Sequence, residues 1–271
     1  MELDQDQDLS FIDDIKSLST MPAIIVDLLA LLNDSTTQTK QIDSKLKLDP
    51  GIVAYLLKCC NSPLFGIRKE VNSIPMAINL LGFTNLKSMI MTHFTKGIYG
   101  SSTKEKIPNH LWKHSISIAV FAKQLSGKLG YKDEETYMAG LLHDIGKLVL
   151  YFHDPDKFEI VFSKVQKDKE EFITAELDTF GFSHVETGFY LMGKWGFSEF
   201  LKNAIMYHHE EDSFLSLNKE FRLIPFANLL AHNALENGEY DLEPFTNLFN
   251  LTPNQLDQVI SEALYILKEY Q

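Results

Sequence analysis

Histidines in the second half of this sequence occur beside residues that commonly bind metal ions. They lie in four short segments, residues 112–115, 142–147, 183–188 and 207–210, and a fifth segment, 226–228, ends in an asparagine. Neutral imidazole and carboxylate groups are good ligands for zinc, manganese and iron. We therefore predict that one buried pocket brings together His114, His143, Asp144, His184, His208 and His209.

His143 and Asp144 lie in a segment, residues 137–150, that is apolar almost all round if it is helical. An ionised aspartate in such a helix is very costly unless a cation or a metal ion compensates its charge. Because neighbouring helix residues project about 100° apart, the two side chains could flank one metal ion or bridge two. The same geometry applies to His208 and His209.

Two glycines and a lysine accompany this pair. Gly140 and Gly146 remove side chains where another helix, which we expect to be the one carrying His114, must approach closely. Lys147 lies one helical turn after His143, and its ammonium group would either offset the carboxylate or bind a phosphate. A solvated lysine at the helix end is the alternative.

Four further histidines match no motif. We expect ordinary surface or core positions for His93, His110 and His153. His232 lies one helical turn after Asn228, so the two residues share a helix face. It is therefore a candidate to supply a ligand that an asparagine does not.

Composition limits the class of protein. With 271 residues, 45% of them hydrophobic, the chain can bury a large core without disulfides. Its two cysteines, Cys59 and Cys60, are adjacent, which suits neither a disulfide framework nor a thiolate metal site and indicates a reducing compartment. The acidic start and the lack of a run of about 18 apolar residues argue against export and membrane spanning, so we predict a cytoplasmic protein. A net charge of -12 disfavours nucleic-acid binding.

The elements that must position these side chains are helices. Apolar residues recur at three-to-four spacing from Ile24 to Leu32, and strand-like alternation is almost absent. Asp49 followed by Pro50 is a strong helix start, and Gly82 should end a short helix that begins near residue 74. In the second half, the pattern and the capping residues predict helices over residues 109–129, 133–151, 155–169, 183–194, 198–210, 219–237 and 253–270.

The stretch of residues 100–108 is rich in serine, threonine, lysine and glycine and offers little to pack. We place a boundary there, between an N-terminal helical subdomain, residues 1–105, and a second helical subdomain, residues 106–271. The predicted fold class is all-α, with the first subdomain packed on the second.

The order of the site residues resembles the HD superfamily of metal-dependent phosphohydrolases, whose pattern is a histidine, a His-Asp pair, further histidines and a closing aspartate. His114 is similar to the first histidine, and His143 with Asp144 to the signature pair. The resemblance implies that His184, His208 and His209 are additional ligands. Such ligands occur in the two-metal HD-GYP cyclic dinucleotide phosphodiesterases. Asn228 occupies the place of the closing aspartate and is the seventh metal-ligand candidate, although a neutral amide is a weaker ligand. The Gly-Tyr-Pro element of the phosphodiesterases does not follow Glu210.

The first half of the chain is similar to the HDOD family, whose name means HD-related output domain. The resemblance is carried by Met21-Pro22, Asp49-Pro50, residues 61–63 and the stretch 74–82. It covers roughly residues 15–235. What it implies is an all-helical bacterial signalling or regulatory domain that acts through contact, in which the HD pocket has often lost ligands.

Three functions are compatible with these residues. The first is a signalling module that contacts an unidentified signalling protein, favoured by the resemblance, by Asn228 and by the small number of arginines, Arg68 and Arg222, that could hold a phosphate. The second is a metal-dependent phosphohydrolase acting on a nucleotide or related phosphoester, with Asp144 and Lys147 as catalytic candidates and one or two Fe, Mn or Zn ions. The third is a pocket whose metal or small ligand sets the angle between the subdomains.

Overall fold

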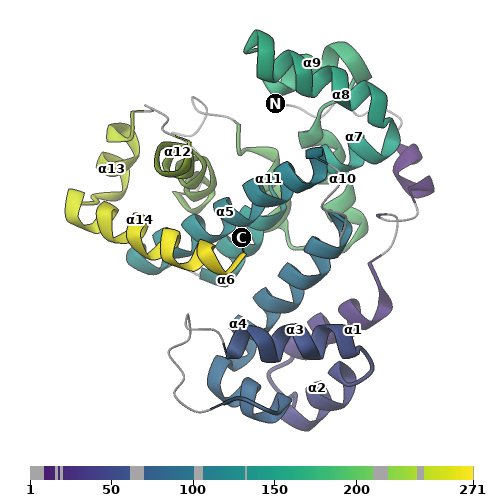
Figure 1. The fold of residues 1–271 in the computed structure, drawn as a ribbon, viewed down its shortest axis with the longest axis vertical. Helices are drawn as coiled ribbons and strands as arrows, with labels where there is room; N and C mark the ends of the chain where they lie inside the picture. The colour runs from purple at the N-terminus through teal and green to yellow at the C-terminus, as the bar shows by residue number, and fades with distance from the viewer. Residues whose placement is uncertain are drawn as a thin grey trace.

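The computed structural model describes residues 9–15, 18, 21–61, 70–100, 106–131, 133–209, 219–236 and 241–270. Within them every regular element is helical, as the sequence predicts (Figure 1). The first part of the chain forms α1 (Ala23–Asn33), α2 (Thr39–Leu46), α3 (Pro50–Cys60) and α4 (Ile74–Ile98). The second part forms α5 (Lys106–Leu129), α6 (Asp133–Leu142), α7 (Ile145–His153), α8 (Pro155–Ser163), α9 (Phe172–Phe180), α10 (His184–Lys194), α11 (Glu199–Met206), α12 (Leu223–Leu235), α13 (Glu243–Phe249) and α14 (Pro253–Leu267). The described 3-10 turns are η1 (Ser10–Asp14), η5 (Lys219–Arg222) and η6 (Lys268–Tyr270), and η3 (Lys164–Asp168) is π-helical.

The first three helices lie together at the foot of the molecule in Figure 1, where α1, α2 and α3 pack on α4. Asp49 caps α3 as predicted, because its Oδ1 atom accepts hydrogen bonds from the backbone amides of Gly51 (2.9 Å) and Ile52 (3.1 Å). The interior of this part contains the fully buried side chains of Leu28, Ile42, Leu46 and Leu56.

α4 rises from these helices towards the middle of the molecule and changes direction at Gly82 (Figure 1). This glycine has φ 72° and ψ 171°, which interrupts the helical backbone and suits a residue without a side chain. The predicted helix end at Gly82 is therefore confirmed. The run that follows packs on α6, where Thr92 and Tyr137 share a hydrogen bond of 2.6 Å.

α5 and α6 form the central pair of the second part, and α7, α11, α12 and α14 pack round them. Gly140 permits the close approach of α6 to α5, because a Cβ there would lie 2.8 Å from the Cα of Ala119. Since α5 carries His114, the expected partner of Gly140 is confirmed. Gly146 has another partner: a Cβ there would lie 1.8 Å from the carbonyl oxygen of His184 in α10, so the expected partner of Gly146 was wrong.

The helix predicted over residues 133–151 is two helices, and His143 and Asp144 lie in the turn between them. The Nδ1 atom of His143 lies 2.7 Å from the carbonyl oxygen of Gly140, so the ring satisfies a carbonyl at the end of α6. The ring of His208 does the same for Ile205 (2.6 Å), and α11 ends at residue 206. The prediction that the two pairs, 143–144 and 208–209, lie on helices was wrong.

Two helices, α9 and α13, were not predicted, and α2 was expected only as one of several short helices within residues 10–99, without bounds of its own. Each has at most nine residues and lacks the long apolar repeat of the central helices. α2 begins with a capping box made by Gln38 and Gln41, a weaker sequence signal than serine or aspartate. The capping box predicted at the start of α10 is confirmed in Ser183 and Glu186, and the last predicted helix is α14 with η6.

One contiguous apolar core runs through both parts, from Ile12 to Leu267. The proposed boundary includes residues 101–105, which lie outside the described residues, as do Ser62, Pro63 and Glu210. The division into two subdomains therefore stays a prediction. None of the described helices has the length and apolar character needed to cross a membrane.

Candidate metal centre

Asp144 lies at the centre of a cluster of histidines. Its Oδ2 atom lies 3.4 Å from Nε2 of His114 and 3.3 Å from Nε2 of His143. Its Oδ1 atom lies 3.4 Å from Nε2 of His184 and 3.3 Å from Nε2 of His208. The two carboxylate oxygens thus face two different sets of imidazoles, and all of these residues except the partly exposed His114 are buried.

The potential ligand atoms form two groups that share Asp144. One group joins it to His184, His208 and His209, and the other joins it to His114 and His143. Within each group the ligand atoms all lie within 4.8 Å of one another. The structure therefore brings together the six residues expected to converge, and the exposed His209 marks where the cluster reaches the surface.

Three of the rings are oriented by their second nitrogen. Nδ1 of His143 and of His208 faces a backbone carbonyl, and Nδ1 of His184 lies 2.6 Å from Oε2 of Glu176. Because these partners are oxygen acceptors, each Nδ1 donates, and in a neutral ring Nε2 then carries only a lone pair. Metal-binding histidines are commonly held in this way.

The lone pairs converge on one another. Nε2 of His184 lies 3.3 Å from Nε2 of His208 and 3.0 Å from Nε2 of His209. Facing lone pairs repel unless a cation lies between them, and in a tetrahedral site with bonds of about 2.0–2.1 Å neighbouring ligand atoms are about 3.3 Å apart. Oδ1 of Asp144 is buried without a hydrogen-bond partner in the described part of the chain, so it offers a fourth ligand atom. This donor set fits a divalent cation.

The charge of Asp144 is balanced by Lys147. Burial alone would raise the pKa of Asp144, but His143, Lys147 and hydrogen bonds from His114 hold that pKa well below its usual range. Nζ of Lys147 donates to Oδ2 of Asp144 at 2.7 Å and lies 4.1 Å from the centre of the Phe172 ring. Lys147 is buried, so the alternative of a solvated lysine was wrong, and its position suits the offsetting of the carboxylate.

Glu176 of α9 is a site residue that sequence reasoning missed. It is fully buried, and its Oε2 atom accepts hydrogen bonds from both the backbone amide (2.8 Å) and Nδ1 of His184. Burial raises the pKa of Glu176 to about 8. The sequence did indicate that Glu176 is buried, because it lies one helical turn from both Phe172 and Phe180 and so on an apolar helix face.

Burial also keeps the histidines neutral. It lowers the pKa of His114 to about 4, and it lowers the pKa of His184, His208 and His209, with Asp144 opposing the shift in each case. Part of His209 is exposed, but its neighbouring imidazoles lower its pKa further. Neutral imidazole is the form that binds metal ions.

Asn228 and His232 lie on α12, outside the two groups. Oδ1 of Asn228 is buried and has no hydrogen-bond partner among the described residues, so a role as ligand stays a prediction. The ring of His232 is centred 6.0 Å from that of His114, and its Nδ1 atom lies 2.9 Å from Oε2 of Glu236. This pairing directs His232 towards Glu236. The structure therefore does not support His232 as a metal ligand in place of Asn228.

The remaining histidines lie apart from the cluster. His153 packs in an aromatic group with Phe11, at 4.1 Å between ring centres, and His93 packs on Tyr55 at 5.0 Å. Burial lowers the pKa of His93 and of His110. His110 differs from the other two because it lines a cavity beside His114.

The chain matches a known protein family. The family model of the HDOD domain matches residues 18–211. The chain is therefore a member of the HDOD family, as its motifs predict.

Similar proteins extend over most of the chain. The solved structure of an HDOD domain protein of unknown function from Geobacter sulfurreducens is 27% identical, covers 94% of this chain and 86% of its own, and has a TM-score of 0.73. A candidate phosphohydrolase from Shewanella amazonensis SB2B shares the fold, with 21% identity, 94% and 98% coverage and a TM-score of 0.70. An uncharacterized protein of Treponema pallidum (strain Nichols) is 25% identical over 204 residues, 74% of this chain. The chain spans 39% of that relative's length.

Proposed function

We propose that this HDOD protein is a regulatory protein of bacterial signal transduction whose histidine cluster binds divalent metal ions. One observation supports the metal above all others: the Nε2 lone pairs of His184 and His208 point into the same small volume as Oδ1 of Asp144, for which the described residues provide no hydrogen-bond donor. A purely structural polar core would instead match each acceptor with a donor.

The two groups of ligands differ in what they offer. Asp144 with His184, His208 and His209 supplies four ligand atoms and would hold the first ion. The group completed by His114 and His143 supplies three, which leaves a position for water or another ligand. Iron, manganese and zinc all suit imidazole and carboxylate ligands.

Elemental analysis of the purified protein is the direct test. Wild-type protein should contain one or more of these ions per chain, and a chelator should lower the temperature of unfolding. His208→Ala should lose metal, whereas His93→Ala, which changes a half-buried histidine away from the site, should retain it. Protein that takes up no metal and melts identically with and without chelator would contradict the proposal.

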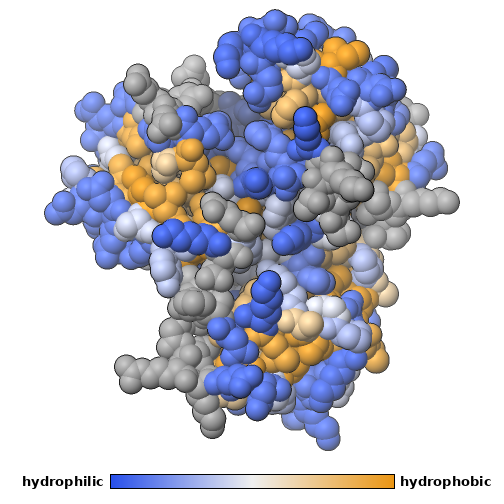
Figure 2. All heavy atoms as spheres, viewed as in Figure 1, coloured by the Kyte–Doolittle hydropathy of each residue, from blue (hydrophilic) through white to orange (hydrophobic). Residues whose placement is uncertain are grey.

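The regulatory action would be exerted through contact with another protein. Family membership supports this, and Figure 2 shows apolar side chains gathered over the N-terminal helices. In the same part of the chain, Leu48 lies between α2 and α3 and is 69% exposed. Cross-linking of the full chain in native lysate, compared with Leu48→Asp, tests the idea. A defined partner that is lost in the variant is expected, and a set of cross-linked proteins unchanged by Leu48→Asp would count against this surface.

Hydrolysis of a phosphoester is the second candidate function. The specific observation in its favour is a cavity that reaches His114, on the three-ligand side of the cluster. Divalent ions bound there would supply Lewis acidity and a water of lowered pKa. The chain itself keeps Asp144 ionised through Lys147 and the imidazoles neutral.

Turnover is tested with protein loaded with manganese, iron or zinc, against nucleotides and cyclic dinucleotides, in parallel with His143→Ala. The variant removes one of the three ligands beside the cavity, so its rate should fall to background. Equal rates for the two proteins would exclude hydrolysis at this site and leave the metal-binding proposal intact.

A further inference from the structure

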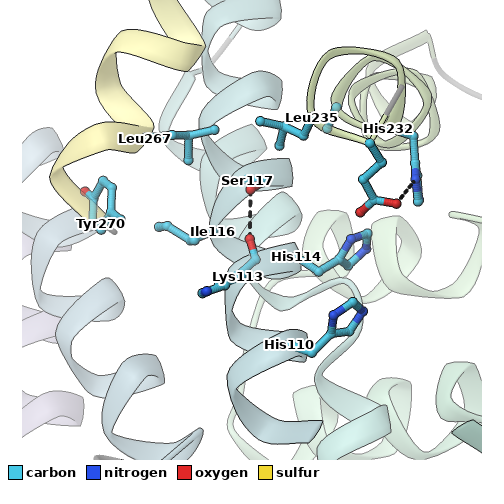
Figure 3. A pocket seen from close by; sticks show the side chains of 11 residues that line it. His110, Lys113, His114, Ile116, Ser117, His232, Leu235, Leu267 and Tyr270 are labelled. Carbon is cyan, nitrogen blue, oxygen red and sulfur yellow. Dashed lines mark hydrogen bonds and ion pairs between the residues drawn. The ribbon is translucent and has the colours of Figure 1, made fainter. Parts of the chain in front are cut away.

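A second cavity, of about 230 Å³, is lined by residues of α4, α5, α6, α14 and η6. A molecule inside it would therefore contact both parts of the chain. Tyr270 of η6 lines this cavity as well as the one that reaches His114. Figure 3 shows Tyr270 on the side of α5 away from the imidazoles of His110 and His114, and none of the proposed metal ligands lines the second cavity. It is therefore a site of its own.

The polar groups of this cavity come from α4 and α5. Asn85 and Ser88 lie one helical turn apart on α4, so they share a helix face. Nζ of Lys123 on α5 donates to Oδ1 of Asn85 at 2.9 Å and lies 5.8 Å from the centre of the Tyr137 ring. The ammonium group of Lys123 and the hydroxyl group of Ser88 are thus held within about one helical turn of each other.

The hydroxyl group of Ser88 is buried without a partner. Ser88 is 5% exposed, and its Oγ atom has no hydrogen-bond partner among the residues that the structure describes. Thr92, one turn further along α4, shows the usual solution, because its hydroxyl donates to the Ser88 carbonyl at 2.7 Å. An unsatisfied buried hydroxyl lowers stability, so a ligand that accepts a hydrogen bond from Ser88 would gain affinity there.

Charge and shape restrict the occupant further. The described walls of the cavity carry one ammonium group and no carboxylate, although the whole chain has a net charge of -12. Such walls favour a single negative charge over a positive one. Met89, Val120, Ile266 and the ring of Tyr270 supply apolar surface. Burial raises the pKa of Tyr270, so its phenol stays neutral. The occupant should therefore combine one negative charge with an apolar part.

We propose that this cavity binds a small aliphatic monocarboxylate, whose oxygens accept from Lys123 and Ser88 and whose chain packs on Ile266 and Tyr270. Acetate would leave the apolar walls without a partner, and an uncharged alcohol would offer the ammonium group no anionic acceptor. A polyphosphate would bring more negative charge than one ammonium group balances. The proposal does not depend on the metal site.

Hexanoate is the probe, compared with acetate and 1-hexanol by NMR titration of the amide signals of the full chain at pH 7.5, where both acids are ionised. Wild type should bind hexanoate about tenfold or more tightly than acetate, because each buried methylene adds affinity. A similar advantage over 1-hexanol is expected from the charge-assisted hydrogen bond to Lys123. The largest shifts should fall on residues 85–89 and 120–124.

Lys123→Met should remove the preference for hexanoate over 1-hexanol. Lys113→Met is the matched control, because Lys113 lies on the same helix but lines the cavity that reaches His114. This variant should bind as wild type. If Lys113→Met lost hexanoate and Lys123→Met retained it, the carboxylate would lie in the other cavity and the proposal would be wrong. If Lys123→Met does not fold, Lys123→Gln replaces it, since an amide can still donate to Asn85.

The two remaining contacts are tested separately. Ser88→Ala should weaken hexanoate and acetate by a similar factor, about threefold or more. Ser117→Ala should weaken neither, since that hydroxyl already donates to the Lys113 carbonyl at 2.8 Å. Ile266→Ala should reduce the advantage of hexanoate over acetate, whereas Ile160→Ala, which changes an exposed isoleucine of α8, should leave it unchanged.

The proposal is overturned if wild type binds hexanoate no more tightly than acetate or 1-hexanol. It is also overturned if the preferences survive both Lys123→Met, or its replacement, and Ile266→Ala. Zinc-loaded and chelator-treated protein should bind hexanoate equally. Binding by the zinc-loaded form alone would place the carboxylate on the metal and would likewise contradict the proposal, whereas a chain that binds hexanoate without holding zinc would contradict only the metal site.

Discussion

Helices α1 to α3 bury leucine, isoleucine and other uncharged side chains, whereas the helices around Asp144 bury an aspartate, a lysine, a glutamate and histidines. Among the described residues of α1 to α3, no aspartate, glutamate, lysine or histidine is buried as a whole residue. Apolar burial needs no partner of opposite charge, but a buried ion is stable only when other groups compensate it. The two parts therefore depend on different conditions although they share one core.

This difference indicates which part of the molecule is shaped by binding. Desolvation of each buried ion costs several kcal/mol, and replacing such ions with apolar residues often stabilises a protein. A region that only had to fold would not gather these groups. Changes in metal, pH and charge should therefore act on the second part and leave the first part unaffected, and four predictions test that contrast.

The largest effect is expected from Asp144→Asn. The change leaves Lys147 buried without its anionic partner and removes the ligand shared by both groups, and breaking a buried ion pair costs about 3–5 kcal/mol. Urea unfolding at pH 7.5 measures the loss, and elemental analysis should find little metal. The double change with Lys147→Met should recover part of the stability. A single variant as stable as wild type would show that this pair does not hold the buried charge.

The second effect concerns the contact of α7 with α10. A Cβ at Gly146 would lie 1.8 Å from the carbonyl oxygen of His184, so Gly146→Ala must force the helices apart, at a cost of about 3 kcal/mol. Because His184 moves with α10, the metal content should fall as well. Gly97→Ala in α4 is the control, since nothing lies within 4 Å of a Cβ there. It should be neutral or stabilise by up to about 1 kcal/mol in urea unfolding. Equal stability of the two variants would contradict the prediction that a Cβ is tolerated at residue 97 but not at residue 146.

The third effect is the pH dependence of chelator-treated protein. His114, His184, His208 and His209 have lowered pKa values in the folded state, so their contribution is present above the unfolded value of 6.5 and is lost as pH falls below it. Glu176 acts in the opposite sense, because its folded pKa of about 8 lies above the unfolded value of 4.5 and its contribution is lost as pH rises. His209 is exposed, so solvent screening reduces its contribution, and the other groups give a net loss from pH 7.5 to pH 5.5 of roughly 1–2 kcal/mol.

Urea unfolding at these two pH values measures the effect. A double variant, His208→Gln with His209→Gln, should show a smaller change, because two of the groups that resist protonation are gone. A free energy of unfolding that stays constant, or increases, between pH 7.5 and pH 5.5 would contradict the assignment of neutral buried histidines.

The features of the fold that the sequence predicted correctly were mostly helix ends, which are set by residues close in sequence. Asp49, Gly82 and Ser183 act through their own neighbours in sequence, and each ends or begins a helix as expected. The site residues were also recognisable, because a carboxylate and histidines in apolar segments need partners.

What could not be predicted depends on contacts between distant segments or on competition for a single backbone group. At the break at residues 143–144, Nδ1 of His143 replaces a backbone amide as the partner of the Gly140 carbonyl in α6. An apolar helical pattern does not indicate this replacement. Glu176 is placed by His184, eight residues away on the next helix, and the partner of Gly146 is set by the packing of α10. Tertiary contacts, not propensity, decided these features.

The smallest effect compares one helix cap from each part. Asp49→Ala removes the acceptor of two backbone amides at the start of α3 and should cost about 1 kcal/mol in urea unfolding, while Asp49→Asn should retain most of the stability. Ser183→Ala removes the corresponding cap of α10, where the next residue is His184, and should cost a similar amount. Only the second change should also reduce metal content, because only that cap positions a ligand. If Asp49→Ala lowered the metal content as much as Ser183→Ala does, the two parts would be coupled through the shared core, and the apolar helices would help to set the geometry of the metal site.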